Sequence, residues 1–112
     1  MCLVLLYTAT EDYCMLEMFQ PRCLKNEVIL MKSAAYGRMR VGRCITPEEV
    51  AAFGEDPRYF GCSSDVLSTL DEKCSGQREC DIPLSYISSK NIKPCFPGLT
   101  VYLEVSYECI SG

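Results

Sequence analysis

Nine cysteines in a chain of 112 residues restrict how this sequence can fold more than any other feature. That content approaches the level of small secreted domains that are held together by disulfides. No two cysteines form a C-x-x-C pair and the chain has no histidine, so a zinc site would need four thiolates at unsuitable spacings. We therefore expect an oxidised, extracellular domain without a metal. The spacing leaves the pairing open, although Cys74 and Cys80 suit a short loop closed by its own disulfide.

Length and charge narrow the classes of function. A chain of 112 residues can bury a modest core, and we expect residues 1–112 to form a single domain. The net charge of −4 disfavours a nucleic-acid partner, which requires a basic face. Without histidine, and without a pair of carboxylates that stands out, we expect neither an enzyme nor a cofactor. No apolar run reaches the roughly 18 residues that span a bilayer.

The first seven residues, MCLVLLY, have two interpretations. We expect an artificial start at Met1 and an edge strand over 3–7, followed by a polar segment over 8–12, so that residues 1–13 are an N-terminal edge strand or an artificial remnant. The alternative is the tail of a truncated signal peptide, although the segment lacks a basic start. In either case the domain core covers about 14–109, and Cys2 is the unpaired thiol, either free or bound outside the domain.

Hydrophobic patterns predict five or six strands. The clearest is 101–109, where apolar and polar residues alternate as in a half-buried antiparallel strand with a polar outer face. Another apolar strand, 28–33, leads into Tyr36-Gly37-Arg38, which we expect to be a sharp turn with a positive φ at Gly37. We also expect a strand over 81–87, interrupted by its proline.

Two helices are expected between these strands. The segment TPEE at 46–49 contains a capping box and a proline at the first helical position, so it predicts a short helix that stops near Gly54. Residues 63–65, SSD, predict the cap of a longer helix that runs to about residue 73.

Several motifs together resemble one known family. They are the spacing of Cys14 and Cys23, AYGR after an apolar strand, a Pro-Cys pair at 94–95, and YLEVSYEC at 102–109. The chain is similar over about 14–109 to the sea-urchin-egg-lectin (SUEL) family of galactose- or rhamnose-binding domains, which latrophilin-type adhesion receptors also carry. The resemblance implies a mainly β fold with helices (α+β): a compact antiparallel β-sandwich with one longer and one short helix.

The family's disulfide pattern maps onto eight of the cysteines without gaps. It implies the pairs Cys14–Cys44, Cys23–Cys109, Cys62–Cys95 and Cys74–Cys80, and it leaves Cys2 over.

The resemblance also implies a ligand-binding site whose polar sugar contacts are substituted. Met15 stands where the family often has Glu, Lys93 where it often has Asp, and Val101 where it commonly has Lys. Losing three hydrogen-bond partners would remove several kcal/mol from sugar binding, since each is worth about 1 kcal/mol and an unpaired buried hydroxyl costs about 1–3 kcal/mol. The candidate site residues are Met15, Tyr36, Arg38, Lys93, Gly98, Val101 and Tyr102.

Tyr36 and Arg38 have an alternative, structural interpretation. In that case Tyr36 is a packed ring, and Arg38 forms an internal ion pair with a carboxylate such as Glu104. Arg38, Arg40 and Arg43 lie close together in the sequence, either as a solvated loop or as an anion site.

We therefore expect a non-catalytic, extracellular recognition module at the cell surface, within a larger multidomain ectodomain. Its expected ligand is a protein or glycoprotein. One alternative is a functional galactose- or rhamnose-type lectin. Another is a binder of anionic polysaccharide, such as heparan sulfate, through Arg38, Arg40 and Arg43.

Overall fold

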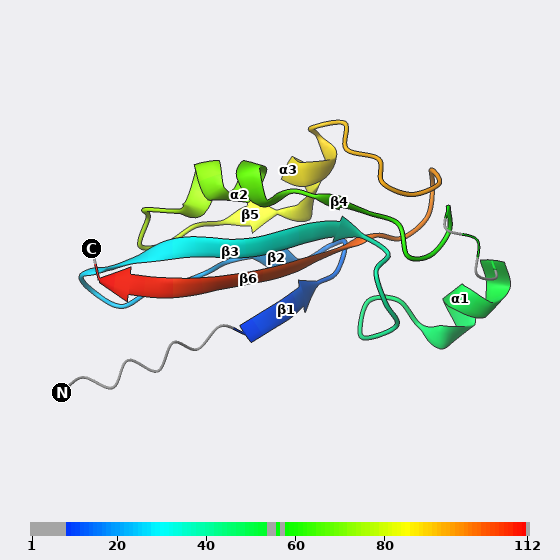
Figure 1. Ribbon diagram of the computed structural model, residues 1–112, viewed down its shortest axis with the longest axis horizontal. Helices are drawn as coiled ribbons and strands as arrows, with labels where there is room; N and C mark the ends of the chain where they lie inside the picture. The colour runs from blue at the N-terminus through cyan, green and yellow to red at the C-terminus, as the bar shows by residue number, and fades with distance from the viewer. Residues whose placement is uncertain (1–8, 54–55, 57, 112) are drawn as a thin grey trace.

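A four-stranded antiparallel sheet forms the frame of the molecule (Figure 1). The computed structural model describes residues 9–53, 56 and 58–111. The sheet has the strand order β1-β6-β3-β4, and a separate two-stranded sheet pairs β2 with β5. The strands are β1 (Ala9–Tyr13), β2 (Met18–Phe19), β3 (Glu27–Gly37), β4 (Ser63–Asp65), β5 (Ile82–Pro83) and β6 (Tyr102–Ser111).

The two long central strands pair along almost their whole length, from Glu27 opposite Ser111 to Gly37 opposite Tyr102. A register shift lies between Met31 and Ser33. Before it, Ile29 and Met31 are the buried residues of β3, and after it the buried apolar side chains are Ala34 and Tyr36. A step of three residues between Met31 and Ala34 would turn a regular strand inside out, so the bulge keeps both apolar pairs on the core face.

Three helices complete the fold: α1 (Pro47–Phe53), α2 (Leu67–Cys74) and α3 (Leu84–Ser88). The capping box of α1 is confirmed, because the Glu49 amide donates to the Thr46 hydroxyl at 3.3 Å and the Thr46 amide donates to the Glu49 carboxylate at 3.5 Å. The Asp65 carboxylate accepts the Leu67 amide at 2.9 Å at the start of α2. None of the helices in the described ranges has the length and apolar character needed to cross a membrane.

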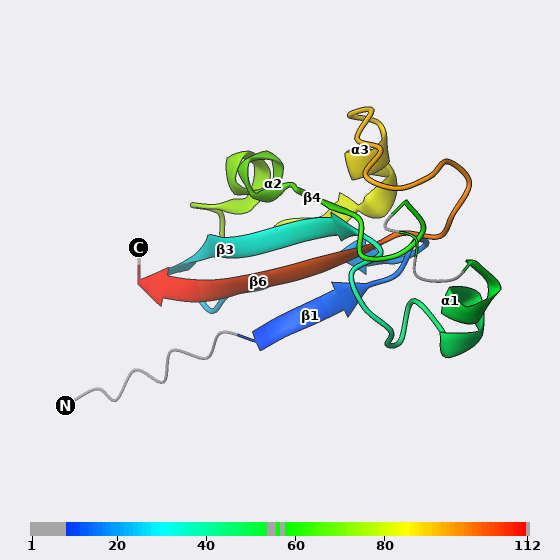
Figure 2. The ribbon, with the colours of Figure 1, turned by 45° about the vertical axis from the view of Figure 1, so that its right-hand side comes forward.

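The hydrophobic core lies between one face of the large sheet and a layer made of α2, α3 and the small sheet. Both views show α2 and α3 on the same side of β3 and β6 (Figures 1 and 2). The sheet and this layer share one buried cluster, which includes Phe19, Ile29, Met31, Ala34, Tyr36, Val66, Leu70, Ile82, Leu84, Ile87, Leu103 and Val105. The fold is therefore mainly β, compact and antiparallel, as expected.

All four predicted disulfides are confirmed. They close segments with sequence separations of 30 (Cys14–Cys44), 86 (Cys23–Cys109), 33 (Cys62–Cys95) and 6 (Cys74–Cys80). Cys2 and the strand expected over 3–7 lie outside the described residues.

The prediction of a strand over 81–87 is wrong beyond its first residues. β5 ends at Pro83, and the next residues form α3 rather than a continued strand. Leu84 and Ile87 stand three residues apart, so one helical face buries both. The sequence thus contains a third helix that the strand interpretation missed.

Two other boundaries also differ from expectation. The N-terminal edge strand was expected over 3–7, before a polar segment, whereas Ala9–Tyr13 pairs with β6 as an edge strand. Residues 63–65 form β4 against the end of β3, although Asp65 still bonds to the first turn of α2.

The expected turn at Tyr36-Gly37-Arg38 is also wrong. Tyr36 and Gly37 continue β3, and they pair with β6 on one side and β4 on the other. The positive φ expected at Gly37 is present, at +158°, and a Cβ built on this residue would lie 2.2 Å from the Cys62 carbonyl oxygen. A glycine stands here because another backbone passes too close for a side chain.

The outer face of β6 is less exposed to solvent than its alternating sequence predicts. Glu104 and Glu108 are partly exposed, but Tyr102 and Ser106 are buried. The Ser106 hydroxyl lies 2.5 Å from the hydroxyl of Ser33 on β3, which satisfies both groups.

Candidate functional site

A cavity of about 210 Å³ lies along the loop that precedes β6. Four of the seven predicted site residues line it: Tyr36, Lys93, Gly98 and Val101. The other lining residues are Ile92, Pro94, Cys95, Phe96, Pro97 and Leu99. We call this cavity, lined by Tyr36, residues 92–99 and Val101, the loop pocket.

Several contacts fix the loop that forms this pocket. The Cys62–Cys95 disulfide ties it to the segment before β4. The Phe96 amide donates to the Arg58 carbonyl at 2.9 Å, and the Phe96 ring lies 5.3 Å from the Tyr59 ring between centroids. Gly98 has φ +89°, a conformation that glycine adopts at little cost. The pocket wall is therefore pre-formed, although half of the Phe96 surface (49%) is exposed.

Arg38 is not among the residues that line the pocket, but it bonds to the loops next to it. The residue is only 1% exposed. Its guanidinium donates to the Tyr59 carbonyl through Nε and to the Thr100 carbonyl through Nη1, both at 2.5 Å. Arg38 thus joins two loops beside the pocket. The ion pair with Glu104 that the structural interpretation expected is not formed, because the Glu104 carboxylate pairs with Arg40 at 3.1 Å.

The two candidate tyrosines lie in different places. Tyr36 is buried in the core and borders the loop pocket, and burial raises the pKa of its phenol. Tyr102 is buried away from that lining, and burial is also the main cause that raises its pKa. The Tyr102 hydroxyl accepts the Arg40 amide at 3.1 Å, so it holds the segment that follows β3. Because both pKa values are raised, both phenols are neutral near pH 7.

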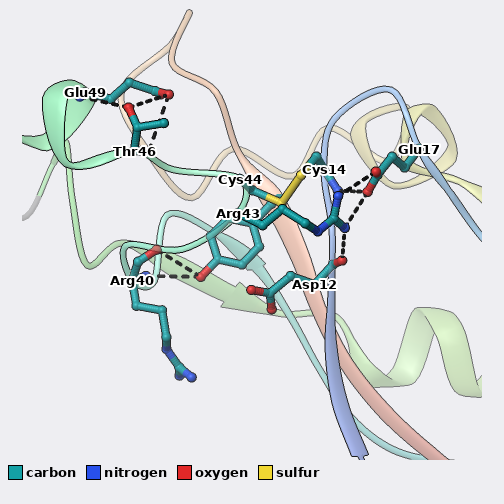
Figure 3. The surroundings of a disulfide bond; sticks show 9 residues. Asp12, Cys14, Glu17, Arg40, Arg43, Cys44, Thr46 and Glu49 are labelled. Carbon is teal, nitrogen blue, oxygen red and sulfur yellow. Dashed lines mark hydrogen bonds and ion pairs between the residues drawn. A yellow bond between two sulfur atoms is a disulfide. The ribbon is translucent and has the colours of Figure 1, made fainter.

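Met15 lies in the turn after β1 and is not among the residues that line the loop pocket. The neighbouring Leu16 is fully exposed. The Glu17 carboxylate accepts the Cys14 amide at 2.7 Å, and two nitrogens of Arg43 contact it at 2.7 Å each. The Arg43 guanidinium also donates to the Asp12 carbonyl. Figure 3 shows this arrangement beside the Cys14–Cys44 disulfide.

The bond from Arg43, with a smaller contribution from the Cys14 amide, lowers the pKa of Glu17 from its ordinary 4.5 to about 2. Glu17 is therefore ionised throughout the physiological range. We call the ion pair between Glu17 and Arg43 the Glu17–Arg43 clamp. Sequence reasoning missed it, although both residues lie near the two cysteines of a disulfide that the family pattern implied.

The three neighbouring arginines do not form one cationic surface. Arg38 is buried, Arg40 pairs with Glu104, and Arg43 pairs with Glu17. In Figure 3 the Arg40 side chain points away from the disulfide and from Arg43. Each charge thus has its own partners, which leaves little field to attract a polyanion.

One group of possible metal ligands occurs in the described part of the chain. The sulfur atoms of Cys23 and Cys109 and a Glu27 carboxylate oxygen lie within 4.8 Å of one another. Because the two sulfurs form a disulfide, neither is a thiolate that could bind a metal.

Comparison with known proteins identifies the family. Residues 21–109 match the family model described as the D-galactoside/L-rhamnose binding SUEL lectin domain. The chain belongs to the SUEL lectin family. This SUEL lectin domain is similar to protein eva-1 homolog C of Pan troglodytes, with 29% identity over 89 residues, and to the mouse protein of the same name, with 28% identity over 90 residues. Each match covers 79% of the chain but only 19% of the relative. The SUEL lectin domain therefore spans about a fifth of the length of these relatives.

The loop pocket includes two of the positions at which the family resemblance implied a sugar contact. Of the three positions at which the resemblance implied a substituted sugar contact, Lys93 and Val101 line the pocket, whereas Met15 does not. The residues that sequence reasoning did not select include Ile92, Pro94 and Leu99. The proline-containing loop around Cys95 was the available signal for them.

Proposed function

We propose that this SUEL lectin domain is a non-catalytic, extracellular recognition module that binds a protein or glycoprotein partner through the loop pocket. The observation that carries this proposal is the composition of the pocket lining. It contains no carboxylate, and its only polar side chains are the phenol of Tyr36 and the ammonium of Lys93. The rest of the lining is apolar apart from backbone.

A monosaccharide fits such a lining poorly. Its hydroxyl groups exchange hydrogen bonds with water for hydrogen bonds with the site, and each unpaired buried hydroxyl costs about 1–3 kcal/mol. Val101 offers no donor or acceptor side chain, and Lys93 offers donors only. Protein interfaces, in contrast, place aromatic and aliphatic side chains at their centre, and the pocket lining offers such side chains in Phe96 and Val101.

The proposed setting follows from the disulfides and from the relatives. Four disulfides suit an oxidising environment outside the cell. Since the chain matches about a fifth of each eva-1 homolog C protein, we infer one module, residues 1–112, within a larger multidomain ectodomain. The pocket lining contains no serine, free thiol, histidine or carboxylate that could form a catalytic set with Tyr36 or Lys93, which supports a binding role rather than catalysis.

The anionic-polysaccharide alternative is less well supported. It depended on Arg38, Arg40 and Arg43, and the structure engages the first with backbone carbonyls and the other two with carboxylates. The competing function is that of a galactose- or rhamnose-type lectin, and the experiment below distinguishes the two.

The experiment compares glycan and cell binding of a tetramerised form of the 112-residue chain. We expect no binding to arrayed galactosides or rhamnosides. We expect cell binding that protease treatment of the cells removes but enzymatic deglycosylation leaves. Phe96→Ser should weaken that binding, whereas Leu24→Ser, which removes another exposed apolar side chain outside the pocket, should not. Binding that free galactose or rhamnose abolishes would overturn the proposal.

A further inference from the structure

We infer that the loop pocket recognises an apolar side chain that stands next to a carboxylate, as in an exposed partner segment with an aromatic or large aliphatic residue beside Asp or Glu. This inference rests on the proposed function and specifies the chemistry of the partner. Two properties of the pocket carry it: its apolar, pre-formed wall and the uncompensated charge of Lys93.

The loop pocket has room for one large side chain. Its volume of about 210 Å³ is below the roughly 300–1,000 Å³ of ordinary small-molecule sites. The Phe96 ring is held against Tyr59, and its backbone is fixed by a hydrogen bond and by the adjacent disulfide. A half-exposed aromatic side chain that is already ordered loses little entropy on binding, which is the usual condition of an interface hot spot.

The charge of Lys93 is not balanced within the described residues. Of the five exposed arginines, Arg22, Arg40, Arg43 and Arg58 each have a carboxylate within 4 Å. The fifth, Arg78, donates to the Cys23 carbonyl. Among the ion pairs of the described part of the chain, none involves Lys93, although this residue is exposed at the pocket.

A ligand that fills the pocket therefore meets one cation and no anion. A carboxylate on the partner gains from this charge, and a cation is repelled by it. Because Lys93 is solvent-exposed, the gain is modest and falls with added salt, so it selects among apolar ligands rather than supplying the main affinity.

The test uses the whole chain, labelled with nitrogen-15, and three blocked pentapeptides as probes. They are Gly-Asp-Phe-Asp-Gly, its charge-reversed form Gly-Lys-Phe-Lys-Gly, and Gly-Asp-Ala-Asp-Gly, which lacks the aromatic ring. We expect the first peptide to shift the amide signals of residues 92–101. The second should bind about threefold or more weakly, given the strength of exposed charge pairs. The third should bind still more weakly, and added salt should reduce the difference between the first two.

Two variants distinguish an effect of the Lys93 charge from a change in the fold. Lys93→Glu should reverse the preference between the first two peptides, and it should leave the remaining amide spectrum unchanged because Lys93 is exposed. Lys25→Glu is the matched control, since it reverses another exposed lysine outside the pocket, and it should leave the preference unchanged.

Each other result has one meaning. Equal binding of the acidic and basic peptides, unaffected by Lys93→Glu, overturns the carboxylate preference while the proposed function stands. Equal binding of the Phe and Ala peptides overturns the apolar part. If no peptide shifts residues 92–101, the inference is wrong, and the cell-binding experiment then decides the proposed function separately. If methyl galactoside or methyl rhamnoside shifts these residues instead, both proposals fail.

Discussion

At the scale of single residues, Gly37 is required by packing between strands and not by the turn that its motif predicted. The Cβ of any other residue would lie 2.2 Å from the Cys62 carbonyl oxygen and 2.7 Å from the Ser63 Cα, both in backbone. Backbone atoms cannot rotate away as a side chain can. The glycine of the AYGR motif is therefore a packing requirement between β3 and β4, and it brings the Cys62–Cys95 bridge close to Arg38.

Gly37→Ala is expected to lower the free energy of unfolding by about 1–3 kcal/mol, the usual cost of overpacking. Gly42→Ala is the control, because its added Cβ would meet only Asp12, at 3.8 Å, and its effect should be within about 0.5 kcal/mol. Chemical denaturation followed by circular dichroism measures both. A Gly37→Ala protein as stable as Gly42→Ala would show that β4 can move away from β3 freely.

Arg38 is a buried cation whose described partners are backbone carbonyls. A guanidinium can donate to the Tyr59 and Thr100 carbonyls at once because its donors have a fixed, planar arrangement. Lysine keeps the charge but lacks that arrangement. Arg38→Lys is expected to destabilise the protein by about 2–4 kcal/mol, since hydrogen bonds from charged groups are worth about 1.5–3 kcal/mol each.

The matched control is Arg40→Lys, which changes an exposed arginine two residues away and should cost less than about 1 kcal/mol. Thermal denaturation compares the two variants. Because Arg38 connects both loops beside the pocket, Arg38→Lys should also increase amide hydrogen exchange in residues 92–101. Unchanged exchange there would contradict the supporting role assigned to Arg38.

Between elements, the Glu17–Arg43 clamp links the turn after β1 to the segment after β3, next to the Cys14–Cys44 bridge. The pKa of Glu17 falls from 4.5 to about 2 on folding, mainly because Arg43 bonds to the ionised carboxylate. A carboxyl group whose pKa is lowered on folding stabilises the protein fully above the unfolded pKa. That contribution is lost as the pH falls from about 4.5 to about 2.

The melting temperature of the unmodified protein should therefore fall over this pH range by more than that of Glu17→Gln. Glu72→Gln, which removes an exposed carboxylate of α2, controls for net charge and should retain the steeper fall. Because Glu17 is partly exposed, added salt should reduce the difference between the curves. Parallel curves for the unmodified protein and Glu17→Gln would contradict the clamp.

At the scale of the whole molecule, the four disulfides close loops of very different length. Cys23–Cys109 joins residues 86 apart, near the two ends of the described chain, whereas Cys74–Cys80 closes a separation of 6. In the chain-entropy account, longer loops restrict the unfolded state more. Replacing both cysteines by serine should then cost about 4–5 kcal/mol for Cys23–Cys109 and about 2 kcal/mol for Cys74–Cys80.

Thermal unfolding under non-reducing conditions measures this order, with peptide mapping to confirm that the other three bridges are intact. A larger loss from the Cys74–Cys80 variant would show that the short bridge has a structural role in α2 that loop entropy does not describe. The same mapping tests whether Cys2 is free.

Patterns that are local in sequence allowed correct predictions. The capping box of α1, the long strand β6 and the apolar part of β3 depend on neighbouring residues, and all three are present. The segment Leu84–Ser88 was mistaken for a strand because a short apolar run after a proline fits either structure. The buried face of Leu84 and Ile87 decides between them, and that face exists only once the large sheet is there to cover it.

The sequence by itself determined the frame of this protein, a disulfide-stabilised, mainly β domain, and its resemblance to the SUEL lectin family implied the four cysteine pairs. Those features follow from local patterns and from motifs that the family shares. Only the tertiary structure decided that Arg38 connects two loops beside the pocket and that Gly37 is required by the passing backbone of Cys62. It also decided that Lys93 and Val101 line one pocket, whereas Met15 does not. The physical reason is that these roles depend on contacts between segments far apart in the chain, which no local pattern encodes.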